Sequence, residues 1–200
     1  MGTGKSAVGR RIATLTGRTF VDLDAEIIAK HGDAVQEVFE RDGEEAFRKL
    51  EREIVAEFAP RRNQVIATGG GTMLAEENVV AFFGAEVFTL TATPEEIHDR
   101  VMADGVASRP VLGSSDDLLA TITSLLAERQ EAYAKFTSVD TTGKSIEQVV
   151  DALRDAGAPI DQEKVVDPEA AKGKVDQILY GVIAVAAVIV VILLILVLTF

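Results

Sequence analysis

Apolar residues along positions 5–155 switch repeatedly between helical spacing and short continuous runs. Helical spacing predicts helices near residues 5–16, 25–30, 34–41, 44–59 and 117–135, together with helices that begin near residues 94 and 145. Short apolar runs predict strands in the segments TFVDLD, QVIATGGG, AEVFTLTA and SVDTT. Helices that alternate with strands in this way are typical of an α/β domain with a parallel sheet.

Residues that start or stop helices support several of these boundaries. Glycine follows three of the predicted helices, at Gly17, Gly32 and Gly43. Ser145 and Gln148 have the spacing of a capping box, in which each side chain binds a free backbone N–H at the start of a helix. The expected elements therefore have chemical boundaries as well as the right periodicity.

The carboxyl-terminal end of the chain has a different composition. Residues 178–200 carry no charged side chain, and as a helix they would span roughly 34 Å, slightly more than a bilayer core. We expect a transmembrane helix here, preceded by a polar linker over residues 157–177; a buried strand or core helix is the alternative. Lys172 and Lys174 favour a cytoplasmic position for the preceding domain.

Charge and cysteine content exclude several classes of function. The chain has 20 Lys and Arg residues against 32 Asp and Glu residues, a formal net charge of −12. Such an acidic chain lacks the broad basic surface that phosphate backbones require, so we expect no nucleic-acid partner. It has no cysteine, which excludes disulfides, thiolate metal sites and a cysteine nucleophile. An anionic ligand must therefore be held by a few well-placed cations.

The first candidate site is the segment MGTGKS at the amino terminus. Gly4, Lys5 and Ser6 open a predicted helix, as in the second half of a phosphate-binding loop. Backbone N–H groups and the lysine ammonium can hold phosphates there, and the serine hydroxyl can bind Mg²⁺. A simple helix cap is the alternative. The motif's first glycine and the strand that feeds the loop would precede Met1, so we expect the natural start to lie upstream and the chain as written to fold poorly.

Two acidic residues form a second candidate site. Asp22 and Asp24 stand at alternate positions of the TFVDLD segment, so a strand through both would project them to one side. Ligands bind at the carboxyl edge of parallel sheets, where one carboxylate could hold Mg²⁺ and the other could accept a hydroxyl proton. The alternative is that Asp24 caps the following helix.

Six short motifs in order identify the chain as similar to a known family. They are G-T-G-K-S-x-V-G-R, F-x-D-x-D, F-R-x-x-E, G-G-G, R-P-x-L and E-R-x-x-x-Y, and over residues 2–155 they resemble shikimate kinases. The resemblance implies a three-layer P-loop kinase fold with a parallel sheet in the order 2-3-1-4-5, whose first strand is missing here. It implies a kinase domain over residues 1–156, substrate-binding helices near 24–59 and a lid near 103–116.

The activity that the resemblance implies is ATP-dependent phosphorylation of the shikimate 3-hydroxyl, on the route to chorismate and the aromatic amino acids. Shikimate carries one carboxylate, which Arg48 and Arg129 would grip because guanidinium suits bidentate pairing. For Arg48 the alternative is an ion pair with Glu51 on an exposed helix face. The resemblance places Gly70 against the substrate ring. Tyr133 is expected to serve packing.

The resemblance also assigns the catalytic and nucleotide-binding residues. Asp24 would bind substrate hydroxyls and orient or deprotonate the attacking one, while Asp22 and Ser6 would hold Mg²⁺. Arg109 resembles the arginine of the family's lid, which closes over ATP. The expected catalytic set is thus Asp24, Lys5 and Arg109, and the expected ATP-binding set is Gly2, Thr3, Gly4, Lys5, Ser6, Ala7, Arg109 and Lys144.

Two rival interpretations stay open at this point. One is another small-molecule P-loop kinase, such as a gluconate kinase, and the other is a membrane-tethered kinase-like module that has lost catalysis. The expected partners are ATP, shikimate and a membrane, for a monomeric kinase domain on the cytoplasmic side.

Overall fold

Four short strands form two separate parallel pairs. The structure is a computed structural model that describes residues 2–33, 35–104 and 117–160. β1 (Thr19–Asp22) pairs with β2 (Gln64–Ala67), with Thr19 opposite Gln64. β3 (Phe88–Thr91) pairs with β4 (Thr137–Asp140), with Phe88 opposite Thr137. These are the two outer pairs of the predicted order, and no strand joins them among the residues that the structure describes.

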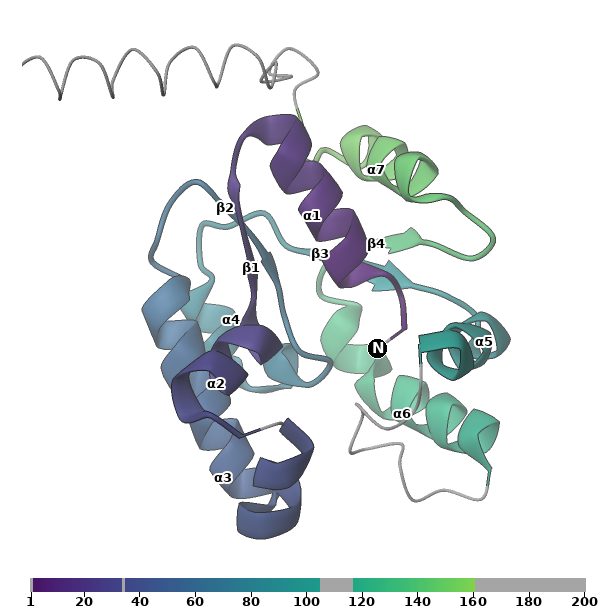
Figure 1. Cartoon of the computed structure of the whole chain (residues 1–200). Helices are drawn as coiled ribbons and strands as arrows, with labels where there is room; N and C mark the ends of the chain where they lie inside the picture. Colours follow the sequence, from purple (N-terminus) through teal and green to yellow (C-terminus); the bar gives the residue numbers. More distant parts are fainter. Residues whose placement is uncertain (1, 34, 105–116, 161–200) are drawn as a thin grey trace, which may run out of the picture. The chain divides into compact units, whose positions relative to one another are not determined.

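Helices surround the two strand pairs (Figure 1). α1 begins where the predicted phosphate loop ends, and Gly17 stops it in the left-handed conformation, as the sequence indicated. The helices are α1 (Lys5–Thr16), α2 (Leu23–His31), α3 (Val35–Phe58), α4 (Glu76–Ala81), α5 (Pro94–Asp104), α6 (Leu118–Tyr133) and α7 (Ile146–Asp155), with a 3₁₀ turn η1 (Thr72–Leu74).

Two helix predictions are confirmed by local geometry. The predicted helices 34–41 and 44–59 are the two arms of α3, which kinks at Gly43, where φ is 84°. Only glycine adopts that conformation at little cost, so the kink depends on this residue. Ser145 and Gln148 form the predicted capping box at the start of α7.

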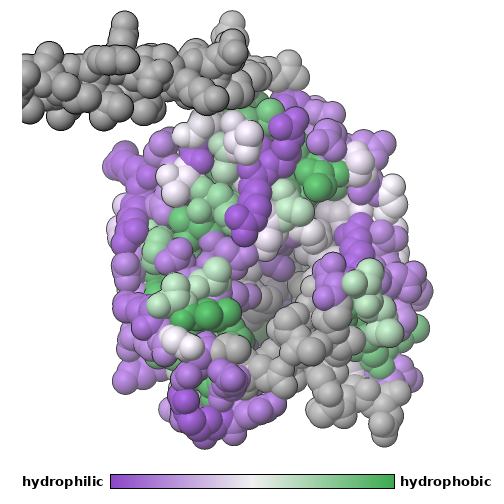
Figure 2. Space-filling model, in the orientation of Figure 1, coloured by the Kyte–Doolittle hydropathy of each residue, from purple (hydrophilic) through white to green (hydrophobic). Residues whose placement is uncertain are grey.

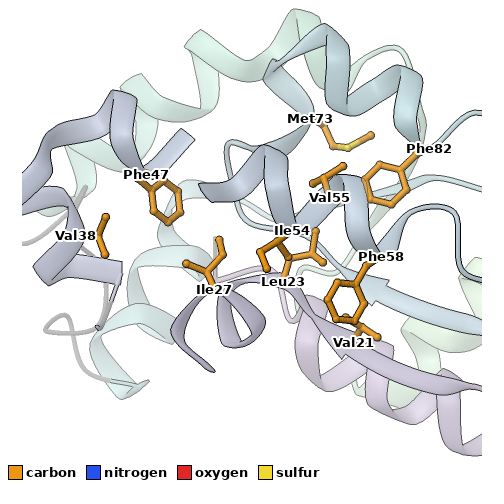
Figure 3. Packing of buried hydrophobic residues seen from close by; sticks show 10 residues of the cluster. All are labelled: Val21, Leu23, Ile27, Val38, Phe47, Ile54, Val55, Phe58, Met73 and Phe82. Atoms are coloured by element: carbon orange, nitrogen blue, oxygen red, sulfur yellow. The ribbon is translucent and has the colours of Figure 1, made fainter. Parts of the chain in front are cut away.

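The largest apolar core holds α2 and α3 against the first strand pair (Figure 3). Leu23 and Ile27 of α2 are fully buried, and Ile54 and Val55 of α3 are almost so. In Figure 3 the ring of Phe58 lies beside Val21 of β1. Leu23 is packed in this core, and this packing positions its two sequence neighbours, Asp22 and Asp24.

One prediction about the acidic pair is wrong. The strand does not run through both carboxylates: β1 ends at Asp22, and Asp24 lies in the first turn of α2. Asp24 is not the cap of α2 either, because the N-cap position belongs to Asp22, which makes no capping side-chain bond. The helix begins at Leu23 because helical spacing places Leu23 and Ile27, four residues apart, on one face that is fully buried in the core.

Several predictions lie outside the described residues. They are Arg109 and most of the lid, the greater part of the linker, and the expected transmembrane segment 178–200. α5 continues through Asp104, so the predicted loop starts later than residue 103. Within the described ranges, no helix combines the length and apolar character needed to cross a bilayer.

Candidate active site

A cleft of about 820 Å³ joins the amino terminus of α1 to the faces of α3 and α6. Figure 2 shows a mostly hydrophilic surface that is hollowed near the centre of the view. The predicted site residues within the described part of the chain all line this cleft: Gly2, Thr3, Gly4, Lys5, Ser6, Ala7, Asp22, Asp24, Arg48, Gly70, Arg129 and Lys144. The fold therefore brings together residues that lie more than 140 positions apart in the sequence.

One end of the cleft has the features of a phosphate-binding site. Gly4 occupies the N-cap position of α1 in the left-handed conformation, and no side chain bonds to the free N–H groups there. This helix N-terminus lies at the cleft, which Lys5 and Ser6 also line. A helix N-terminus attracts anions through its free N–H groups and its dipole. The Ser6 hydroxyl donates a 2.7 Å hydrogen bond to Asp22 Oδ2, so the two predicted metal ligands are already in contact.

Arg100 is a cleft residue that the sequence analysis missed. Its guanidinium donates to the carbonyl oxygen of Gly2 at 3.3 Å and to the hydroxyl and carbonyl oxygens of Thr141 at 3.0 and 2.8 Å. It also pairs with Glu96 one turn earlier on α5. Arg100 thus joins the start of the phosphate loop to the segment after β4. No local pattern reveals this contact, because its two partners lie 98 and 41 residues away.

Lys144 lines the same end of the cleft, in the turn that leads to α7. Its ammonium donates a 2.7 Å hydrogen bond to the carbonyl oxygen of Asp140 at the end of β4. The side chain is exposed, so it remains accessible to a ligand.

The other end of the cleft is organised around a buried carboxylate, Glu51. It is 2% exposed, accepts a 2.9 Å hydrogen bond from Arg48 and a 2.5 Å hydrogen bond from the Thr72 hydroxyl. Arg48 also pairs with Glu44 at 3.0 Å. The ion pair between Arg48 and Glu51 therefore exists, but it does not lie on an exposed helix face. Glu51 is buried, and Arg48 is partly buried.

The carboxylates of Glu51 and Glu44 also affect the ionisation of Arg48. Burial acts to lower the pKa of Arg48, but the hydrogen bonds and charges of Glu51 and Glu44 outweigh it and raise that pKa. The guanidinium therefore stays charged while it faces the cleft.

The glycine turn after β2 fits closely against these side chains. A Cβ atom on Gly71 would lie 2.5 Å from both terminal nitrogens of Arg48. A Cβ atom on Gly69 would lie 2.8 Å from Asp24 Oδ1 and 3.0 Å from Glu51 Oε1. A side chain at either position would therefore have to displace the end of the Arg48 or Asp24 side chain, which glycine avoids.

Asp24 lies where the two ends of the cleft meet. Burial is the main cause that raises the pKa of Asp24, and the negative charge of Asp22 acts in the same direction. The positive charge of Lys5 opposes them, and Glu51 adds a smaller upward effect. A carboxylate with a raised pKa is a better proton acceptor than an ordinary aspartate, which suits a general base.

Arg129 and Gly70 complete the lining of this end of the cleft. Arg129 lies on α6, and Gly70 lies in the turn between β2 and η1. Three structural elements therefore supply the groups predicted to hold the substrate carboxylate and ring.

The comparisons with known proteins agree on one family. A family model described as shikimate kinase matches residues 1–156. The chain is 43% identical to a shikimate kinase of Symbiobacterium thermophilum over 153 residues, which cover 75% of this chain and 87% of that protein. It is 42% identical to a shikimate kinase of Geobacter sulfurreducens over 152 residues, 75% of this chain and 82% of that one.

Solved structures show the same relationship in three dimensions. The structure of a shikimate kinase from Acinetobacter baumannii in complex with shikimate matches with a TM-score of 0.71 and 29% identity, covering 78% of this chain and 87% of that one. A shikimate kinase from Bacteroides thetaiotaomicron matches with a TM-score of 0.69, 28% identity, and coverage of 78% and 93%. The fold is therefore that of an α/β P-loop kinase, and the chain belongs to the shikimate kinase family.

Proposed function

We propose that this protein transfers the terminal phosphoryl group of ATP to the 3-hydroxyl of shikimate and releases ADP and shikimate 3-phosphate. The observation that carries the proposal is one cleft with a phosphate-binding helix terminus at one end and two arginines at the other. The first suits the nucleotide, and the second suits a small acceptor with a carboxylate.

The proposed transfer begins at Asp24. Its carboxylate takes the proton of the attacking hydroxyl, the hydroxyl oxygen forms a bond to the terminal phosphorus, and the bond from that phosphorus to the leaving oxygen of ADP breaks. Lys5 and the N-terminus of α1 hold the phosphates while charge moves to the leaving group. Arg109, outside the described residues, is proposed as the lid arginine that completes this charge stabilisation.

Shikimate is held by groups on three elements in this proposal. The guanidinium of Arg48 on α3 and that of Arg129 on α6 bind the carboxylate, and Gly70 lets the backbone approach the ring. Glu51 has a supporting role, because its buried carboxylate sets the direction of the Arg48 guanidinium through their 2.9 Å contact.

The residues near the phosphate loop fit a magnesium ion bound with ATP. Ser6 and Asp22 offer a hydroxyl and a carboxylate oxygen in contact with each other, and Mg²⁺ prefers a few such oxygens together with water and phosphate. When bound, the ion would neutralise charge on the phosphates. Its remaining ligands would come from ATP and water.

We also propose that residues 178–200 anchor a cytoplasmic kinase domain to a membrane. The support is the sequence alone: an uncharged apolar run long enough to span a bilayer, preceded by a polar linker with two lysines.

The assay that tests the function compares two acceptors. The natural protein in mild detergent, with ATP and Mg²⁺, should release ADP when shikimate is added and should not do so with gluconate. Asp24→Asn should lower kcat by at least about 100-fold, because it removes the proton acceptor. ADP release that depends on gluconate, or ATP binding with no turnover on shikimate, would contradict the proposal.

Gly71→Ala should weaken the binding of shikimate without weakening that of ATP. Gly71 has φ −121°, which alanine adopts freely, so the only new effect is a methyl group against the Arg48 guanidinium. We expect the KM for shikimate to rise about tenfold or more and the KM for ATP to change less than about twofold. Arg48→Lys serves as the comparison and should raise the same KM. Equal KM values for shikimate in Gly71→Ala and the parent protein would argue against contact between the turn and a substrate-binding Arg48.

The rate should fall as the pH drops through the raised pKa of Asp24. Its carboxylate must be deprotonated to accept the hydroxyl proton, and its pKa is raised, so activity is lost as pH falls through that raised value. A profile of kcat/KM for shikimate at saturating ATP should show an acid limb centred above about pH 4, the range of an ordinary aspartate. Samples returned to neutral pH should recover full activity, which excludes unfolding. A flat profile down to pH 4 would remove Asp24 as the base.

The membrane proposal can be tested on a chain of unchanged length. The parent protein should sediment with membranes and should be released by detergent but not by high salt. Replacing Val188 and Val191 with lysine places two charges in the middle of the run, at a cost of about 3 kcal/mol each on insertion scales, and should move the protein to the soluble fraction. Soluble parent protein without detergent would refute the anchor.

A further inference from the structure

Tyr133 links two parts of the cleft that are far apart in the sequence. It is the last residue of α6, one helical turn after Arg129. Its hydroxyl donates a 2.5 Å hydrogen bond to the carbonyl oxygen of Gly70, 63 residues away. Residues four positions apart lie on the same face of a helix, and Arg129 lines the same cleft as the glycine turn.

The surroundings of Tyr133 suit a permanent hydrogen-bond donor. Its ring is partly buried and packs against the apolar core that holds α2 and α3. Burial is the main cause that raises the pKa of Tyr133, and the positive charge of Arg129 opposes this rise. The phenol therefore stays protonated near neutral pH and can donate to the Gly70 carbonyl, with the guanidinium of Arg129 in its electrostatic surroundings.

The turn that Tyr133 holds is the one that fits against the other substrate-binding groups. Gly70 stands between Gly69, which abuts Asp24 and Glu51, and Gly71, which abuts Arg48. The Tyr133 hydroxyl therefore connects the end of α6, which carries Arg129, to the turn that lies against the Arg48 guanidinium. Within the described ranges, the Tyr133 hydroxyl is the only side-chain group that donates a hydrogen bond to the Gly70 carbonyl.

We propose that Tyr133 is a positioning residue that sets Arg129 and the Gly69–Gly71 turn at the separation needed to bind a carboxylate with both arginines. The proposal rests on the proposed function in one respect, the assignment of Arg48 and Arg129 to the substrate carboxylate. It gives Tyr133 a part in specificity, where the sequence indicated packing alone: the hydroxyl would favour acceptors that bear a carboxylate over similar rings that lack one.

Tyr133→Phe separates this role from packing because it keeps the ring and removes only the hydroxyl. We expect the KM for shikimate to rise about 5- to 20-fold, the loss typical of one buried hydrogen bond, with the KM for ATP unchanged within about twofold. The preference for shikimate over its primary amide, measured as the ratio of kcat/KM values, should fall by a similar factor. Thermal unfolding should show that the variant is folded.

Phe136→Leu is the matched control. Phe136 follows Tyr133 by three residues and packs against the same core, but it has no hydroxyl. The substitution should lower thermal stability and leave the KM for shikimate and the preference over the amide unchanged.

A double-mutant cycle with Arg129→Ala decides whether Tyr133 acts through Arg129. If it does, Tyr133→Phe should have a much smaller effect on the KM for shikimate in the Arg129→Ala background than in the parent protein. Equal effects in both backgrounds would overturn the proposal, as would an unchanged KM in Tyr133→Phe while Arg129→Ala raises it. If Arg129→Ala itself leaves the KM unchanged, the assignment of Arg129 to the carboxylate fails, and the role of Tyr133 fails with it.

Discussion

The buried carboxylate of Glu51 is the constraint on which the end of the cleft proposed to bind shikimate depends. A carboxylate that is 2% exposed must be paired and hydrogen-bonded, since an unpaired charge in that position would cost several kcal/mol. Arg48 and the Thr72 hydroxyl meet this need, which joins α3 to the 3₁₀ turn η1 after the glycine turn. The same contacts leave one side of the Arg48 guanidinium facing the cleft. The contacts that satisfy the buried charge of Glu51 therefore also orient Arg48, the arginine proposed to bind the substrate.

The glycine turn is the second part of that arrangement. Side chains at Gly69 and Gly71 would collide with Asp24, Glu51 and Arg48, so the turn can approach these groups only because it has none. Asp24 is the point where this end meets the phosphate-binding end, because it shares its environment with Asp22 and Lys5 as well as with Glu51. Charges from both ends of the cleft therefore act on Asp24, which suits its proposed role as the base.

Much of the fold could be predicted from the sequence because the signals are local. The stop of α1 at Gly17, the kink of α3 at Gly43 and the capping box of α7 each depend on residues within a few positions. The extent of β1 could not be predicted in the same way. Alternation favoured a strand through Asp24, but α2 begins at Leu23. Helical spacing buries Leu23 and Ile27 together, and this tertiary packing outweighs a two-residue pattern.

The sequence by itself determined which chemical groups are available: an ammonium and a hydroxyl at a helix start, two aspartates after a strand, two arginines and a run of glycines. These are properties of residue type and short spacing. The tertiary structure alone decided which groups meet. It buried Glu51, joined Arg100 to Gly2 across 98 residues, and set the Tyr133 hydroxyl on the Gly70 carbonyl across 63. Such contacts follow from the path of the whole chain, and no local pattern encodes them.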